Sequence, residues 1–145
     1  MQSPSRTAPN KYPRKMNKRE AGVLAKFGKQ MASFIYNFST DGGAIASYAS
    51  GFNLPANSVV TNVYTDEQSA FASATSAVRF TVKAGATALT AAIDPTASAG
   101  IQAPALAGSA AGIKIASASA LTFDISAEAA TAGKMRVAVE FYISE

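Results

Sequence analysis

The sequence predicts an all-β protein: antiparallel strands form a sandwich or a barrel, preceded by an extended basic N-terminal arm that includes a short helix. Three observations predict this fold. Residues 135–143 alternate apolar and polar side chains without a break, shorter alternating stretches lie before them between Gly, Pro and Ser, and positive charge gathers in the first thirty residues. Strict alternation is typical of half-buried strands, and no helical segment long enough for a parallel βαβ unit separates them.

The composition limits the chemistry that the chain can perform. Its 145 residues fit one domain and include neither Cys nor His, so thiolate chemistry and the commonest general base and metal ligand are missing. Much of the 48% hydrophobic content is alanine, which buries little area, so we expect association with identical copies. No apolar run reaches about 18 residues and none follows the polar N-terminus, so we expect a soluble protein made inside the cell, with no membrane partner.

The net charge of +4 is unevenly distributed along the chain. Residues 1–30 hold eight basic residues against one acidic residue, a net +7, whereas the rest hold five basic and eight acidic residues, a net −3. We therefore predict a basic N-terminal arm and anchoring segment in residues 1–43 and a β domain in residues 44–145. The candidate partner-binding residues are the basic side chains of the arm: Arg6, Lys11, Arg14, Lys15, Lys18, Arg19, Lys26 and Lys29.

The first 19 residues contain three prolines and few apolar side chains, which predicts a segment that is extended or disordered when free. It is either a plain solubilising tail or an arm that becomes ordered along an acidic partner.

Residues 19–38 carry an amphipathic pattern. Residues 34–38 have strand composition, so the prediction is a helix that gives way to a strand near Ser33. Such a stretch can lie on a membrane or in a partner's groove, but we favour packing on the protein's own body or on its neighbour. The apolar side chains at helical spacing are Leu24, Phe27, Met31 and Phe34 or Ile35.

The body begins after a turn at residues 40–43 and a Pro-containing lead-in at residues 52–57. Residues 94–112, rich in Ala, Ser, Gly and Pro, predict a long surface loop or a loosely ordered edge, with Ile101 and Leu106 as its large apolar anchors. Residues 88–93 fit a strand or one helical turn, and residues 130–134 are expected to be the connection into the last strand. Alternation predicts strands at residues 58–66, 78–83, 113–116, 121–126 and 135–143.

The chain is poor in groups that converge on chemistry. Asp66 and Glu67 are adjacent, but neighbours on a strand point to opposite faces. Gly133 and Lys134 lack the earlier glycine of a phosphate-binding loop, and Ser or Thr nucleophiles have no His partner. We therefore expect no enzyme activity, no cofactor and no metal site.

Nucleic acid is a second possible partner of the basic arm, which also carries Tyr12 and Phe27. The arm's lysines and arginines can neutralise several phosphates. The body, however, is net acidic and offers no matching aromatic platform, so we favour an acidic protein surface as the partner.

Three stretches resemble small virion structural proteins of tailed bacteriophages, of the capsid decoration (cement) or head-fibre type. They are LPANSVVTNVY at residues 54–64, LTAAI at residues 89–93 and TAGKMRVAVEF at residues 131–141. The resemblance covers about residues 52–145 and implies a compact, jelly-roll-like β-sandwich, often trimeric, on the capsid lattice. It implies no catalytic residues.

The expected function is thus a non-enzymatic decoration protein that is made in the host cytoplasm and located on the capsid surface. It would bind the major capsid protein or other virion proteins through its arm, as a homo-oligomer for which a trimer is favoured. The alternatives are a nucleic-acid-binding module that uses the same arm, and a tail or head-fibre component that binds host glycans through residues 94–112. In the expected last strand, four side chains lie opposite the core face: Arg136, Ala138, Glu140 and Tyr142. If these side chains are covered, the cover must come from a neighbouring copy or sheet.

Overall fold

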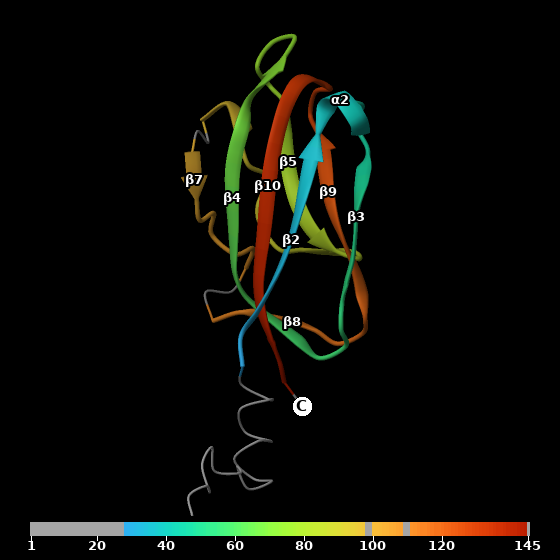
Figure 1. The fold of residues 1–145 in the computed structure, drawn as a ribbon, viewed down its shortest axis with the longest axis vertical. Coiled ribbons are helices and arrows are strands. Elements are labelled where there is room, and N and C mark those ends of the chain that lie inside the picture. The colour runs from blue at the N-terminus through green and yellow to red at the C-terminus, as the bar shows by residue number, and fades with distance from the viewer. Residues whose placement is uncertain (1–27, 98–99, 109–110, 145) are drawn as a thin grey trace, which may run out of the picture.

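The computed structural model describes residues 28–97, 100–108 and 111–144, which form two antiparallel sheets packed face to face (Figure 1). The predicted all-β sandwich is confirmed. The strand order of the five-stranded sheet begins with β2 (Gln30–Asn37), β10 (Ala130–Ile143) and β4 (Ser58–Ser73). Two short strands, β7 (Gly100–Gln102) and β8 (Ile113–Ile115), both pair with the free side of β4.

The four-stranded sheet lies behind the first in Figure 1. A one-turn helix, α2 (Phe38–Asp41), follows β2, and a short 3-10 helix, η1 (Pro95–Ala97), precedes β7. The strand order of this second sheet is β3 (Ser47–Leu54), β9 (Ser119–Ser126), β5 (Arg79–Ala84) and β6 (Thr87–Ala88).

Strand β10 is an inner strand of the five-stranded sheet, because it pairs with β2 on one side and with β4 on the other. Its inward side chains, from Met135 to Phe141, are buried as the alternation predicts. The strand is longer than predicted. Residues 130–134 are part of β10 and not a connection, since they pair with β4 through several register shifts. The Gly-containing sequence of residues 130–134 is similar to that of a turn. In the structure, each register shift adds an irregular residue to a strand that is otherwise continuous.

Gly133 occupies one of these irregular positions, with φ 137°, and its backbone approaches the Phe71 ring closely. A Cβ at this position would lie 2.5 Å from the ring carbons. Gly133→Ala should therefore lower the free energy of unfolding by about 1–3 kcal/mol, measured by urea denaturation. Gly51→Ala is the matched control, because Gly51 also has a positive φ, 81°, but open space around it. Equal losses in the two variants would contradict an effect of the Phe71 contact.

Strand β2 takes the place of the helix expected up to Ser33, among the residues that the structure describes, and the strand expected from residue 34 is confirmed as far as Asn37. Ala32, Phe34 and Tyr36 point into the core, while Met31 is 54% exposed and Ile35 lies on the same outer side. Met31 and Phe34, expected on one helical face, are thus on opposite faces. The alternating burial of a strand prevails over the helical spacing because all eight residues of β2 pair in register with β10. The expected helix before residue 28 lies outside the described residues.

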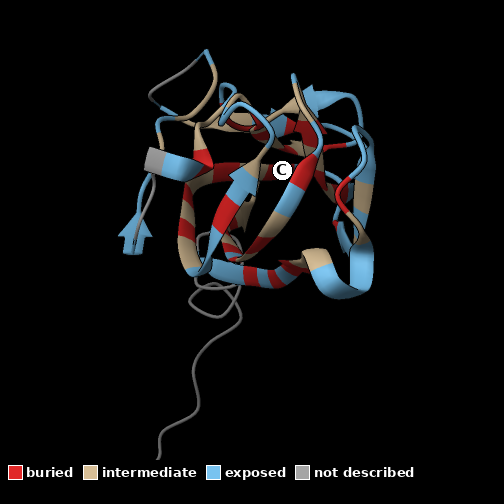
Figure 2. Cartoon of the chain, turned by 90° about the horizontal axis from the view of Figure 1, so that it is seen from above, coloured by how far each residue is buried: buried red, intermediate tan, exposed pale blue. Residues whose placement is uncertain are grey.

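The core between the sheets contains a stack of aromatic rings. Phe123 of β9 lies parallel to Tyr36 and to Phe80, with ring centroids 4.6 Å and 4.7 Å apart. The Tyr36 hydroxyl donates a hydrogen bond of 2.5 Å to the Gly42 carbonyl at the end of α2. Burial, with Tyr48 and Asp41 nearby, raises the pKa of Tyr36 to about 12. Figure 2 shows the buried residues gathered between the two sheets.

The strand at residues 78–83 is confirmed as β5, with Phe80 and Val82 buried. Strand β3 was missed, because it ends in the expected lead-in, and residues 88–93 form only the end of β6 and two isolated bridges. Within residues 94–112, Leu106 packs against the core as predicted, but Ile101 is 76% exposed and is not an anchor.

Candidate binding surface

The structure describes only one of the eight arm residues that the sequence predicts as partner-binding. Arg6, Lys11, Arg14, Lys15, Lys18, Arg19 and Lys26 lie outside the described residues. Lys29 is described and is exposed, just before β2 begins. Its ammonium group lies 3.8 Å from the Glu140 carboxylate on β10. The division between an arm ending at residue 43 and a domain beginning at residue 44 stays a prediction, although β2 is itself part of the five-stranded sheet.

Glu140 is the centre of a polar cluster on the outer side of this sheet. Its carboxylate accepts hydrogen bonds of 2.9 Å from the Thr61 hydroxyl and 2.9 Å from the Asn62 amide. Two consecutive residues of β4 can reach one side chain because the register with β10 shifts between Glu140 and Phe141, which makes Thr61 the extra residue of a bulge. The bulge therefore turns two neighbouring polar side chains to the same face.

These contacts lower the pKa of Glu140, mainly through the Asn62 hydrogen bond, then through Thr61, with a smaller effect of Lys29. A carboxyl group whose pKa is lower in the folded state stabilises the fold above its unfolded pKa, and this stabilisation is lost as the pH falls through the folded pKa. Glu140→Gln should thus be less stable than the natural chain at pH 7, and the difference should shrink as the pH falls from about 5 towards 3. Urea denaturation at a series of pH values measures it. A difference that stays constant down to pH 3 would contradict this role.

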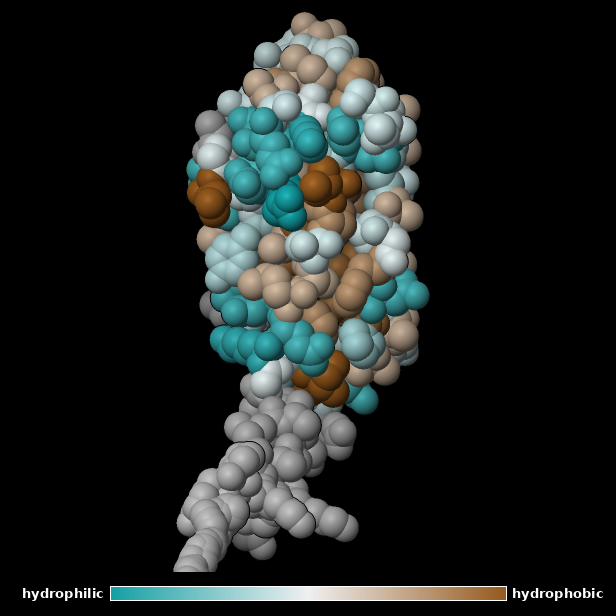
Figure 3. All heavy atoms as spheres, in the orientation of Figure 1, coloured by the Kyte–Doolittle hydropathy of each residue, from teal (hydrophilic) through white to brown (hydrophobic). Residues whose placement is uncertain are grey.

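The side chains on the outer face of the five-stranded sheet form rows across its strands. One row runs from Ile35 through Arg136 and Asp66 to Ile101, and it joins β2, β10, β4 and β7. Figure 3 shows this face, with hydrophilic groups in its upper and lower parts and a paler, more apolar band between them. The two further rows are Ser33–Ala138–Tyr64 and Met31–Glu140–Asn62.

The outer face of the four-stranded sheet is different, because it carries a polar network around Asp124. The Asp124 carboxylate accepts hydrogen bonds from Ser47 and Thr122 and lies 3.3 Å from the Lys83 ammonium group. Such a face is typical of a sheet surface that contacts water. Of the five exposed large apolar side chains among the described residues, three lie on the five-stranded sheet: Met31, Ile35 and Ile101. The other two are Phe52 of β3 and Ile45 just before that strand. The five-stranded sheet is therefore the better candidate for contact with another protein.

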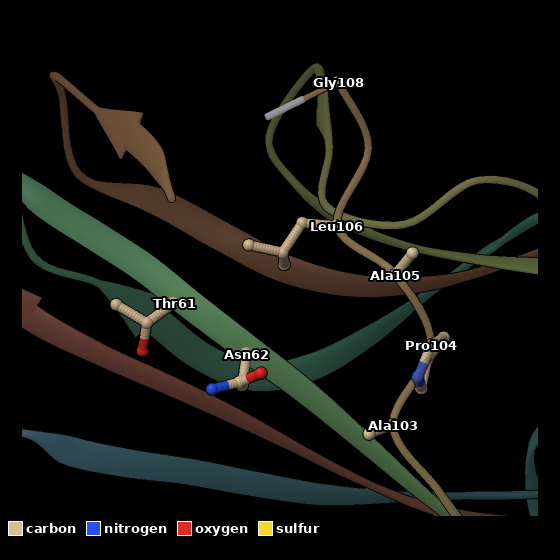
Figure 4. A pocket seen from close by; sticks show the side chains of 7 residues that line it. All are labelled: Thr61, Asn62, Ala103, Pro104, Ala105, Leu106 and Gly108. Atoms are coloured by element: carbon tan, nitrogen blue, oxygen red, sulfur yellow. The ribbon is translucent and has the colours of Figure 1, made fainter. Parts of the chain in front are cut away.

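A shallow cavity of about 450 Å³ lies beside the Glu140 cluster. Thr61 and Asn62 line one side from β4, and the segment at residues 103–108 lines the other (Figure 4). This segment crosses to the second sheet, where the Ala107 N–H donates a 2.9 Å hydrogen bond to the Leu89 carbonyl. The lining contains no aromatic and no charged side chain, so the cavity offers no platform for stacking a sugar ring or a base.

The described part of the chain holds no group of three or more His, Cys, Asp or Glu residues that could bind a metal ion. Asp66 and Glu67 do not form a paired site: Asp66 lies in the outer row beside Arg136, and Glu67 accepts the backbone N–H of Phe71 at 3.1 Å. No helix among the described residues is long and apolar enough to cross a membrane.

Comparison with solved structures places the fold among the components of phage particles. Chains in three phage capsid structures share it. They come from the acid-stable capsid of Helicobacter pylori bacteriophage KHP30 (TM-score 0.59, 14% identity, 81% of this chain and 89% of that chain), from the capsid of cyanophage Pam1 (0.60, 17%, 80% and 85%), and from the capsid of Ralstonia phage GP4 (0.64, 18%, 83% and 86%).

The likeness confirms the resemblance to phage virion proteins at the level of the fold, since each alignment spans most of both chains. No protein-family model and no curated protein matches this chain.

Sequence reasoning missed two features of this surface. The Glu140 cluster depends on a bulge at Thr61, and a bulge of one residue leaves no signal in an alternating sequence. The exposure of Ile101 was missed because a lone apolar residue in a polar stretch usually predicts an anchor.

Proposed function

We propose that this chain is a non-enzymatic structural protein of a bacteriophage virion, a capsid decoration (cement) protein that binds the major capsid lattice and stabilises the shell. The observation that carries the proposal is the fold shared with chains of three phage capsid structures over at least 80% of this chain. The matched chains have lengths similar to this one, because each alignment covers a comparable share of both partners. A body of this size suits an accessory position on a shell.

The basic arm supplies the attachment in this proposal. Seven of the chain's thirteen basic residues lie in residues 1–27, before the first described strand. The body is net acidic, so an acidic shell surface attracts the arm and not the sandwich. The arm emerges at Lys29, at one end of the five-stranded sheet, and from there it can extend across neighbouring coat subunits. Association of the attached copies, favoured as trimers, belongs to the same proposal.

Co-sedimentation tests the proposal against the alternative of nucleic-acid binding. The net charge of +7 in residues 1–30 is the observation that supports this alternative. The full chain is mixed either with DNA-free capsid shells stripped of it or with double-stranded DNA, over a range of salt concentrations. We expect saturable binding to the shells at physiological ionic strength and no binding to DNA there. Binding to DNA with a steep salt dependence, and none to shells, would instead support the nucleic-acid function.

A further inference from the structure

Strand β2 differs from the other edge strands of the sandwich. The opposite edge of its sheet is divided into β7 and β8, which have three residues each. In the second sheet, β6 has two residues, and β3 has a register shift between Ala49 and Asn53. Short and irregular strands of this kind prevent a sheet from pairing with other chains. Strand β2 has eight residues, pairs with β10 without any register shift and contains no charge and no proline.

The free side of β2 offers backbone groups for pairing. Among the described residues, β2 pairs with no strand other than β10. At its end, the Asn37 N–H donates to the Asp41 carboxylate at 2.8 Å and is thus turned away from β10. Backbone groups of an antiparallel strand alternate sides, so the N–H and C=O groups of Met31, Ser33 and Ile35 face the same open side. These three residues also carry the outward side chains of β2.

From this geometry we propose that two copies of the chain associate through β2, antiparallel and around a two-fold axis at Ser33, so that their five-stranded sheets become continuous. Paired residues of one sheet point to the same face, which requires the axis to pass through a single residue. With Ser33 on the axis, Met31 of each copy lies opposite Ile35 of the other. Two apolar cross-strand pairs then cover side chains that are 54% and 42% exposed in the single chain.

The ends of the strand also match in this register. Lys29 lies opposite Asn37 of the second copy, whose N–H is bound to the Asp41 carboxylate. The Lys29 ammonium group of each copy therefore lies near the Asp41 carboxylate of the other copy. The pairing of the two strands ends there, because Asp41 occupies the open edge. The two neighbouring registers do not place Lys29 opposite Asn37, or Met31 opposite Ile35. An axis at Ala32 places Lys29 opposite Ile35, and an axis at Phe34 places Met31 opposite Asn37.

A second copy fits this edge better than an acidic shell surface does, because the strand itself carries no charge for such a surface to attract. The pairing is independent of the arm's role. It forms a two-fold contact, whereas the association favoured for the attached protein is three-fold, so the two contacts use different surfaces.

Sedimentation velocity of the full chain over a concentration series tests the pairing. We expect a dimer, and we expect Ile35→Lys to raise its dissociation constant at least about tenfold, because an edge lysine opposes strand pairing. Ile101→Lys is the matched control: it also replaces an exposed isoleucine on the outer face, but at the opposite edge, and it should leave the dimer unchanged. A monomer at all concentrations, or a trimer that resists Ile35→Lys, would overturn the proposal.

Cross-linking provides a test that does not depend on weakening the dimer. The natural chain has no cysteine, so Ser33→Cys introduces a single thiol beside the axis. A short bis-maleimide linker should join two copies of this variant with high yield. Ser69→Cys, which also replaces an exposed serine but lies on β4, should give only background cross-linking. Equal yields for the two variants would contradict the register.

Discussion

Deleting residues 2–27 should abolish attachment of the protein to capsid shells while leaving the β-sandwich folded. The deletion removes seven of the thirteen basic residues and stops before β2, which begins at Gln30 and pairs along its whole length with β10. A deletion extending into β2 would instead remove an edge strand and expose the core at Phe34. Shell occupancy measured by co-sedimentation should fall to background, and the circular dichroism spectrum and the urea midpoint of the shortened chain should stay close to those of the full chain.

A milder variant separates charge from length. Replacing Arg14, Lys15, Lys18 and Arg19 with Gln keeps the arm's length and removes its densest cluster of charge. Occupancy should fall at least about tenfold, and the remaining binding should depend less on salt. The control replaces Lys83 and Lys114 of the body with Gln and should bind normally. Full occupancy of the four-residue variant would contradict attachment by charge, and full occupancy after the deletion would contradict attachment by the arm.

Phe123→Ala should be among the most destabilising single substitutions in the body. Its ring is fully buried and stacks between Tyr36 of one sheet and Phe80 of its own sheet, so its loss leaves a cavity between the two layers. Replacing a buried phenylalanine with alanine costs about 3–5 kcal/mol, a large share of the stability of a small domain. Equilibrium urea denaturation measures this change.

Phe52→Ala is the matched control for this prediction. Phe52 is 37% exposed and contacts only the edge of the aromatic core, at a centroid distance of 6.4 Å from Phe141. Its replacement should cost less than half as much as Phe123→Ala. A Phe123→Ala variant as stable as the natural chain would show that the stack does not hold the two sheets together.

The sequence predicts the strands whose alternation is regular. Residues 135–143 and 78–83 have one apolar and one polar face, and burial on a single face is what such a pattern requires, so β10 and β5 lie where expected. The prediction from sequence fails where the same residues fit both the helical and the strand period. Met31 and Phe34 satisfy helical spacing, and Ala32, Phe34 and Tyr36 satisfy strand spacing. Pairing with β10, a contact about 100 residues away in the chain, decides between them.

The candidate surface was less predictable than the fold for a related reason. Lys29 was recognised as part of a basic segment, but its neighbour Glu140 lies on another strand, and Glu140 is held in place by a bulge in a third. Cross-strand neighbours follow from register, and register depends on irregular residues such as Thr61 and Gly133 that resemble their surroundings in the sequence.

Cryo-electron microscopy of intact particles that carry this chain tests its proposed role most directly. We predict density for the two-sheet body on the outer surface of the shell, with residues 1–27 continuing from Lys29 over the coat subunits. A body found in the tail or fibres, or density only inside the shell beside the genome, would contradict it.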